Sequence, residues 1–179
     1  MNILALDPAS NCGWAHSNGQ FGTWRLRDSG RMAIEKEHVY LERYLERAIE
    51  SMGVEMIATE NAGFGSQNPE VQARHNERLG IIRLVAARHQ IEVQAFAPST
   101  IKLFATGEGH AKKPAMVAAC KRLLKINVTS DDEADAIWIL ELAKRRDCWP
   151  ATNRLGKQRK KKGASKRKSK SAVKEKRLF

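Results

Sequence analysis

The spacing of apolar residues predicts a chain that begins with short strands and continues as strands alternating with helices. Two apolar runs bounded by turn residues, Ile3–Asp7 and Val54–Thr59, are typical of buried strands. Asn18-Gly19 separates two further short runs, and this dipeptide favours a hairpin turn. A last strand is expected where apolar and polar residues alternate beyond residue 90. The expected strands are 3–7, 12–17, 21–26, 54–59 and 91–95.

Helices are predicted where apolar residues recur at intervals of three and four. The segment 32–52 follows this pattern with charged residues between, which indicates an amphipathic helix. Asn68-Pro69 starts a second helix, because proline suits a first helical position, and Pro98 ends the last strand. The expected helices are 32–52, 68–88, 114–124 and 130–149. A hairpin followed by alternating strands and helices indicates an α/β domain with a mixed sheet.

Charge divides the chain at about residue 150. Residues 1–150 carry 19 Lys or Arg and 19 Asp or Glu, whereas residues 151–179 carry 13 and 1. The tail has almost no apolar residues, so we expect it to be disordered and to bind a polyanion such as DNA through its positive charge. The tail residues predicted to bind DNA are Lys160, Lys161, Lys162, Lys166, Arg167 and Lys168.

The chain lacks the sequence features of a membrane or secreted protein. It has no run of about eighteen apolar residues and no basic region followed by an apolar core and a cleavage site. Its three cysteines have no metal-site or disulfide spacing. We therefore expect no membrane association and a cytoplasmic location, either with the nucleoid or in a host cell if the protein is phage-encoded.

Acidic residues close two of the buried runs. Asp7 and Glu60 each follow apolar residues, where an ionised carboxylate is costly unless it is paired or bound to a metal. Ligand sites of open α/β sheets gather at the carboxyl ends of strands, which is where both acids are expected. For either acid alone, the alternative is a carboxylate that leaves the sheet into solvent or caps a turn.

A third acidic segment, Asp131 to Asp135, opens the last predicted helix. Ser130 as N-cap and Glu133 three positions later form a capping box, and acids oppose the helix dipole. Capping explains Asp131 but not Asp135, which lies beyond the first turn. Asp132 shares a helix face with Asp135 at a spacing of three, and Asp131 does so at a spacing of four, so spacing leaves both open.

Convergence of these three acidic segments would give a ligand set made only of oxygen atoms. Such a set suits a hard cation, Mg²⁺ or Mn²⁺. Two cations about 4 Å apart can hold a phosphodiester oxygen, activate a water and stabilise the leaving oxygen. A basic protein with such a site is most simply interpreted as a nuclease.

Three motifs in order give the chain a family resemblance. They are Leu6-Asp7-Pro8 followed by Gly13-Trp14, Ile57–Glu60, and Asp132–Ala136. Over about residues 1–148 the chain resembles the RuvC family of Holliday-junction resolvases. The resemblance implies a ribonuclease H-like fold, in which a mixed five-stranded sheet is flanked by helices. The chain departs from the family at Ala9, where Gly is usual, and in its basic tail, so a phage or mobile-element source would suit it.

The resemblance also implies an activity and a set of site residues. The activity is that of a crossover junction endodeoxyribonuclease, which cuts branched DNA and leaves 5′-phosphate and 3′-hydroxyl ends. Two Mg²⁺ ions are expected, with Mn²⁺ as a substitute. The implied metal-binding catalytic residues are Asp7, Glu60, Asp132 and Asp135, which selects Asp132 over Asp131. The implied DNA contacts are Phe64 near the junction bases, catalytic Lys113 with Lys102 at the phosphate, and Lys112 as an alternative to Lys113.

The resemblance further implies a homodimer, because the segment 79–83 is similar to the helix that pairs subunits in the family. Three other functions remain open at this point. The chain is alternatively a ribonuclease H-like nuclease that acts on flaps or RNA–DNA hybrids, or a non-catalytic protein that binds junctions architecturally. An actin-like ATPase also begins with a strand ending in Asp, but it normally needs two such domains.

Overall fold

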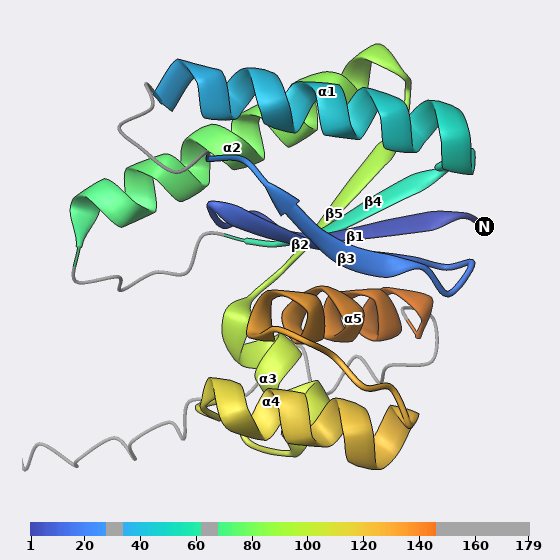
Figure 1. Cartoon of the computed structure of the whole chain (residues 1–179), viewed down its shortest axis with the longest axis vertical. Helices are drawn as coiled ribbons and strands as arrows, with labels where there is room; N and C mark the ends of the chain where they lie inside the picture. The colour runs from blue at the N-terminus through green and yellow to red at the C-terminus, as the bar shows by residue number, and fades with distance from the viewer. Residues whose placement is uncertain (28–33, 62–67, 146–179) are drawn as a thin grey trace, which may run out of the picture. The chain divides into compact units, whose positions relative to one another are not determined.

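The computed structural model describes residues 1–27, 34–61 and 68–145, and these contain the predicted mixed sheet (Figure 1). The sheet has five strands in the order β3-β2-β1-β4-β5. β1 and β2, and β2 and β3, pair antiparallel, whereas β1 and β4, and β4 and β5, pair parallel. The strands are β1 (Ile3–Asp7), β2 (Asn11–His16), β3 (Phe21–Arg25), β4 (Met56–Glu60) and β5 (Glu92–Phe96). The predicted fold class is confirmed.

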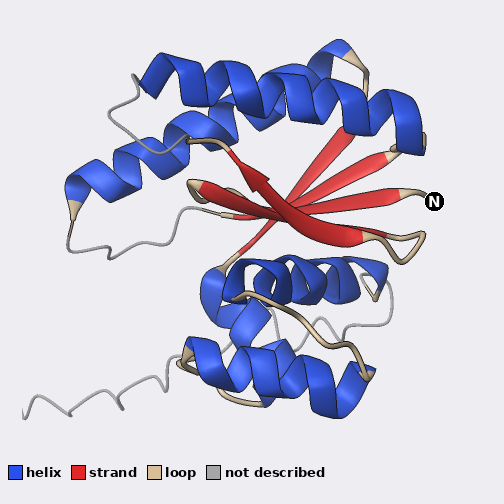
Figure 2. Ribbon diagram, in the orientation of Figure 1, coloured by secondary structure: helices blue, strands red, loops and turns tan. Residues whose placement is uncertain are grey.

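Helices cover both faces of the sheet (Figure 2). On one face lie α1 (Ile34–Met52) and α2 (Pro69–Arg88), which pack against each other. On the other face α5 (Asp131–Lys144) packs on the sheet, and α3 (Pro98–Thr106) and α4 (Lys113–Ala119) pack against α5. α4 continues as the π-helical turn η1 (Cys120–Leu124). No helix among the described residues has the length and apolarity that crossing a membrane requires.

Two sequence predictions of helices need correction. Pro98 ends β5 but also begins α3, which the sequence analysis did not predict. Pro98 at its first position is a start signal, but the helix is short and its N-cap, Ala97, forms no side-chain cap. α5 ends at Lys144, five residues before the predicted end, because the backbone N–H of Arg145 turns back to the carbonyls of Leu142 and Ala143.

Alternation along the strands separates the two sides of the sheet. Leu4, Leu6 and Ile57 are fully buried in the core beneath α1 and α2, together with Leu41 and Leu45 of α1. The odd-numbered positions of β1 and the even-numbered positions of β4 therefore face α5. This alternation decides which face of the sheet carries the acids at the strand ends.

α5 is buried around most of its circumference because it lies between the sheet and two other helices. Its apolar residues, from Ala134 through Ala143, are almost all buried. The indole Nε1 of Trp138 donates to the carbonyl of Met116 in α4 at 3.1 Å, and the Trp138 ring meets Phe104 of α3 edge-on. A helix held on both sides in this way gives its first turn a fixed position relative to the strands.

Candidate metal-dependent active site

Asp7 and Glu60 lie side by side at the carboxyl ends of β1 and β4. The two strands are parallel neighbours, and Leu6 is in register with Thr59, so the next residue of each strand is an acid. Because Leu6 faces the α1 and α2 side, alternation directs Asp7 to the face that carries α5. The structure thus brings together the two strand-end acids that the sequence analysis selected.

Gly13 allows the first turn of α5 to reach these strand ends. It pairs with Asp7 across the antiparallel β1–β2 ladder. A Cβ atom at Gly13 would lie 2.0 Å from the carbonyl oxygen of Asp132 and 2.5 Å from its carbonyl carbon. Such contacts are far inside van der Waals separation, so only glycine permits this approach. The backbone of Asp132 therefore rests directly on β2, opposite Asp7.

The cap of α5 holds this turn in place much as predicted. The Ser130 hydroxyl accepts a hydrogen bond from the backbone N–H of Glu133 at 3.2 Å, which makes it the expected N-cap. Glu133 does not complete a standard capping box with Ser130. Its carboxylate instead accepts from the N–H of Thr129 at 2.7 Å and from the Thr129 hydroxyl. The predicted capping box is therefore wrong in its partner, because Glu133 binds Thr129, the residue before the N-cap.

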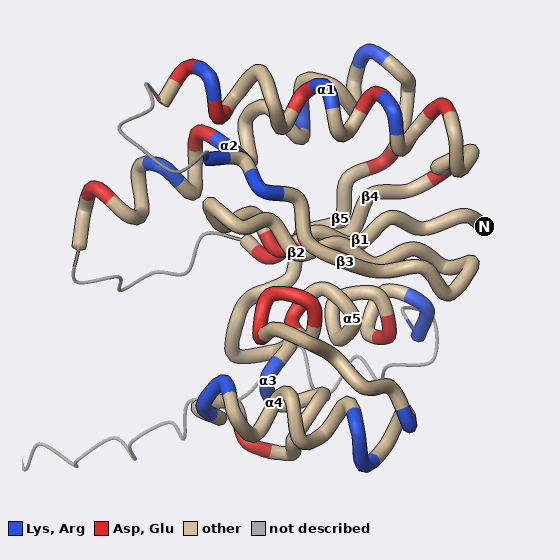
Figure 3. Tube along the Cα trace, viewed as in Figure 1, with Lys and Arg blue, Asp and Glu red and all other residues tan. Residues whose placement is uncertain are grey.

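The four candidate carboxylates act on one another electrostatically. Burial, followed by the charges of Glu60, Asp135 and Asp132, raises the pKa of Asp7 well above its ordinary value. Burial and Asp135 raise the pKa of Glu60 to about 7, and burial raises that of Asp135 to about 6. Burial and Asp131 raise the pKa of Asp132. Figure 3 shows the acidic first turn of α5 next to the sheet. The site holds more negative charge than its surroundings balance.

This donor set fits a divalent cation by chemistry and by charge. All four side chains offer oxygen, the ligand atom of Mg²⁺ and Mn²⁺, and a cation would offset their mutual repulsion. Within the described ranges no three His, Cys, Asp or Glu side chains already stand in metal-holding geometry. The carboxylates are nevertheless close enough to shift one another's pKa.

Lys113, the first residue of α4, lies at the rim of the site and forms an ion pair with Asp131. The hydrogen bond that Lys113 donates to Asp131 raises the pKa of Lys113 and lowers the pKa of Asp131. Asp131 was predicted only as a residue that begins the helix, but it also pairs with Lys113. No spacing rule could have found this pair, because its members are 18 residues apart on different helices.

Lys102 and Lys112 differ in their relation to the carboxylates. Lys102 lies on α3, and its positive charge opposes the rise in the pKa of Glu60 and of Asp135, as does that of Lys113. Lys112 is exposed as the residue preceding α4. The structure thus places Lys102 and Lys113 near the acids. Lys102 stands on a helix, α3.

Several predicted DNA contacts lie outside the described residues. Phe64 falls in the gap 62–67, and the basic tail falls in 146–179. The tail residues concerned are Lys160, Lys161, Lys162, Lys166, Arg167 and Lys168. The sequence analysis also missed the role of Gly13, although Gly13-Trp14 was part of the pattern it used.

A mixed sheet of this order, with acids at the ends of β1 and β4 and at the start of the last helix, defines the ribonuclease H-like class of nucleases. A family model described as "Crossover junction endodeoxyribonuclease RuvC" matches residues 3–141. A protein of that description from Rickettsia africae is 31% identical over 148 residues, which cover 78% of this chain and 94% of the relative. The chain belongs to the RuvC family.

Solved structures agree on the fold. The Thermus thermophilus RuvC structure matches with a TM-score of 0.67 at 19% identity, over 83% of this chain and 96% of that one. The structure of T. thermophilus RuvC in complex with Holliday junction substrate matches with a TM-score of 0.65 at 18% identity, over 78% and 90%. Family membership makes the protein a junction-resolving endodeoxyribonuclease, of a family whose members are metal-dependent nucleases.

Proposed function

We propose that this endonuclease cuts four-way DNA junctions with two Mg²⁺ ions held by Asp7, Glu60, Asp132 and Asp135. The observation that carries the proposal is the convergence of four acids from two strand ends and one helix start, with raised pKa values. A cluster of half-buried acids that nearby lysines balance only in part is unfavourable for stability alone, which points to a functional role.

Each element contributes a different part of the reaction. When bound, the ions would activate water for in-line attack and stabilise the leaving oxygen, giving 5′-phosphate and 3′-hydroxyl ends. Asp7 and Glu60 present their oxygens from rigid strands, and α5 presents those of Asp132 and Asp135. Mn²⁺ would substitute for Mg²⁺, because it accepts the same oxygen ligands.

Lys113 would contact the scissile phosphate after leaving Asp131. Both side chains are substantially exposed, so the pair is weak and can exchange Asp131 for a phosphate oxygen. Lys102 would add positive charge on the α3 side, and Lys112 would contact a flanking phosphate. Phe64, which follows the second acid in sequence, would stack on the unpaired junction bases.

The enzyme would act as a homodimer through α2, so that two sites meet two opposed DNA strands. In support, α2 exposes the apolar side chains Val71 and Leu84, and Gly80 leaves open space where a Cβ would be. Sedimentation equilibrium would show a dimer that Leu84→Glu weakens. A monomer at all concentrations would contradict this part of the proposal.

The division into a nuclease domain, 1–150, and a basic DNA-binding tail, 151–179, is also part of the proposal. The tail carries 13 basic residues and one acidic residue, so it would follow the DNA backbone without reading its sequence. The cytoplasm, at the nucleoid or in an infected host, is the location that this substrate implies. Truncation after Pro150 should lower junction affinity and flatten its salt dependence. Unchanged values would argue against the tail's role.

The central test uses a labelled four-way junction, a linear RNA–DNA hybrid and a flap of matched length. The wild-type protein should cut the junction with Mg²⁺ and leave it intact with EDTA. Asp7→Asn should lower cleavage by about a thousandfold or more, equivalent to about 4 kcal/mol, with junction binding retained. Equal cutting of the hybrid and the junction would contradict junction selectivity, and cleavage by Asp7→Asn would contradict the metal assignment.

A further inference from the structure

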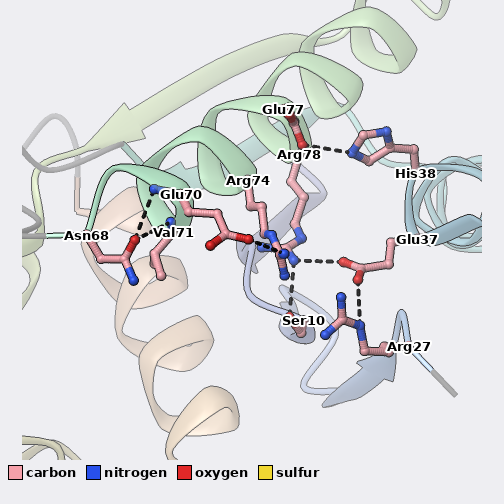
Figure 4. A network of polar contacts seen from close by, with 10 residues as sticks. All are labelled: Ser10, Arg27, Glu37, His38, Asn68, Glu70, Val71, Arg74, Glu77 and Arg78. Carbon is pink, nitrogen blue, oxygen red and sulfur yellow. Dashed lines mark hydrogen bonds and ion pairs between the residues drawn. The ribbon is translucent and has the colours of Figure 1, made fainter. Parts of the chain in front are cut away.

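A buried ion-pair network joins α1 and α2 (Figure 4). Glu37 of α1 is fully buried and binds two guanidinium groups. One of its oxygens accepts from Nε of Arg27 at 2.8 Å, and the other accepts from Nη2 of Arg78 in α2 at 2.8 Å. Arg78 is itself only 5% exposed. Two buried charges on separate helices are therefore fixed in a single geometry.

Arg78 extends this network to the turn that follows Asp7. Its Nη2 donates to the Ser10 hydroxyl at 3.1 Å, and its Nη1 lies 3.5 Å from the carbonyl oxygen of Pro8. The turn is closed on Asp7 by the N–H of Ala9, which donates to the Asp7 carbonyl at 2.8 Å. One guanidinium thus contacts both residues that flank Ala9, and the backbone N–H of Ala9 is hydrogen-bonded to Asp7.

The same face of α2 also meets the second strand-end acid. His75 lies three residues before Arg78, so the two side chains share a helix face. Burial lowers the pKa of His75, and a hydrogen bond to the backbone of Glu60 opposes that change. α2 therefore contacts the backbone at the ends of both β1 and β4, while α5 approaches those ends from the other face.

We propose that Arg78, held by Glu37, is a positioning residue that fixes the turn after β1 and so sets where the Asp7 carboxylate meets a metal ion. The inference rests on the proposed function, because it needs Asp7 to be a metal ligand. Arg78 itself touches neither metal nor DNA. It acts through Ser10 and Pro8, in the way that outer contacts orient metal-binding side chains in other proteins.

The geometry of the network sets it apart from an ordinary link between two helices. Arg88 of α2 also pairs with an acid of α1, Glu42, but both of these side chains are largely exposed and reach no strand end. A pair that only joined α1 to α2 would not need to be buried or to reach Ser10. Arg88 therefore provides a matched control on the same two helices.

The test measures junction cleavage by the full-length protein against Mg²⁺ concentration, together with junction binding in EDTA. Arg78→Lys keeps the charge but loses the forked contact to Glu37 and Ser10, so the half-activating Mg²⁺ concentration should rise about 10- to 100-fold. Ser10→Ala removes only the turn contact and should raise the half-activating Mg²⁺ concentration about threefold or more. Arg88→Lys should leave it unchanged, and all three variants should bind junction as the wild type does.

Ser10→Ala keeps the test decisive even if Arg78→Lys folds poorly, because it leaves the Glu37–Arg78 pair intact. The inference fails if Ser10→Ala and any folded Arg78→Lys need no more Mg²⁺ than the wild type while Asp7→Asn is inactive. A lower maximal rate without any shift in the Mg²⁺ curve would also overturn it, since that is the result of a purely structural role. Cleavage by Asp7→Asn would instead overturn the proposed function on which the inference rests.

Discussion

Glu37 and Glu60 are acidic side chains in the same domain whose pKa values move in opposite directions. Burial raises both. At Glu37 the hydrogen bonds and charges of Arg78 and Arg27 outweigh burial and bring the pKa below its ordinary value. At Glu60 burial and Asp135 dominate, and Lys102 and Lys113 only partly oppose them, so the pKa reaches about 7.

Acids in one fold can thus have two roles: some hold the structure in place, and others form the candidate active site. A buried acid whose charge is balanced within the protein holds its partners in one geometry and has little capacity left for a ligand, and removing one member of the pair is strongly destabilising. A cluster of acids that the protein leaves unbalanced reduces stability but attracts a cation. The two clusters lie on opposite faces of the sheet, and the short turn 8–10 separates them.

Removing the balanced acid should have the largest effect on stability. Glu37→Ala leaves the guanidinium of Arg78 buried without its partner, so the free energy of unfolding should fall by about 3–5 kcal/mol. Urea denaturation followed by circular dichroism measures this change. In the matched control, Arg88→Ala breaks an exposed pair between the same helices and should cost about 1 kcal/mol or less. Equal losses in the two variants would remove the contrast between buried and exposed pairs.

Gly13→Ala tests the contact between β2 and the first turn of α5, and its effect on stability should be intermediate. The new methyl group meets the backbone of Asp132, which cannot rotate away as a side chain would, so α5 must shift. We expect a loss of about 1–3 kcal/mol in the free energy of unfolding, and a loss of cleavage greater than the unfolded fraction explains. Gly109→Ala, where a Cβ would make only ordinary contacts with Ser99, is the control. Wild-type cleavage by Gly13→Ala would show that the close approach is not needed.

The smallest effect expected is a pH dependence of stability. With EDTA present, Glu60 and Asp135 bind protons more readily in the folded protein than in the unfolded chain, because their pKa values are raised to about 7 and about 6. The free energy of unfolding should therefore fall as pH rises through 6 and 7, by roughly 1 kcal/mol per pH unit near the midpoints. Thermal unfolding between pH 5.5 and 8 measures this dependence.

Glu60→Gln is the internal control for the pH experiment. Burial lowers the pKa of His75, so His75 changes the free energy of unfolding with pH in the opposite direction, and it does so in both proteins. The variant should lose less stability than the wild type between pH 6 and 8, and excess Mg²⁺ should reduce the difference. Parallel curves for the two proteins would mean that Glu60 titrates at its ordinary pKa.

Local patterns were sufficient to predict most elements and the three acidic segments, whereas the family resemblance was needed to choose Asp132 over Asp131. The apolar run before Asp7, the Asn18-Gly19 turn and Asn68-Pro69 are short-range signals, and each marks an element that the structure contains. The Asn68 side chain accepts from the N–H groups of Glu70 and Val71, as expected of a helix cap. Each of these features depends on residues a few positions apart, which is the range over which sequence patterns carry information.

The parts that the sequence did not predict depend on contacts between distant residues. The ion pair of Lys113 with Asp131 joins two helices, and that of Glu37 with Arg78 joins residues 41 positions apart. α3 has no side-chain cap from which the sequence could have predicted it. α5 is buried on nearly all sides, so its hydrophobic pattern did not reveal which face meets the sheet. Tertiary packing decided each of these features.

The contact between Gly13 and the backbone of Asp132 has a consequence for how the enzyme can vary. No side chain of Gly13 stands between the strand and the helix at this point, so main-chain contact sets how closely the Asp132 backbone approaches β2. Replacements elsewhere beneath α5 can alter its packing and stability while this one dimension stays constant. In the proposed two-ion reaction, the position of the Asp132 backbone on the sheet would thereby be insulated from changes in the surrounding core.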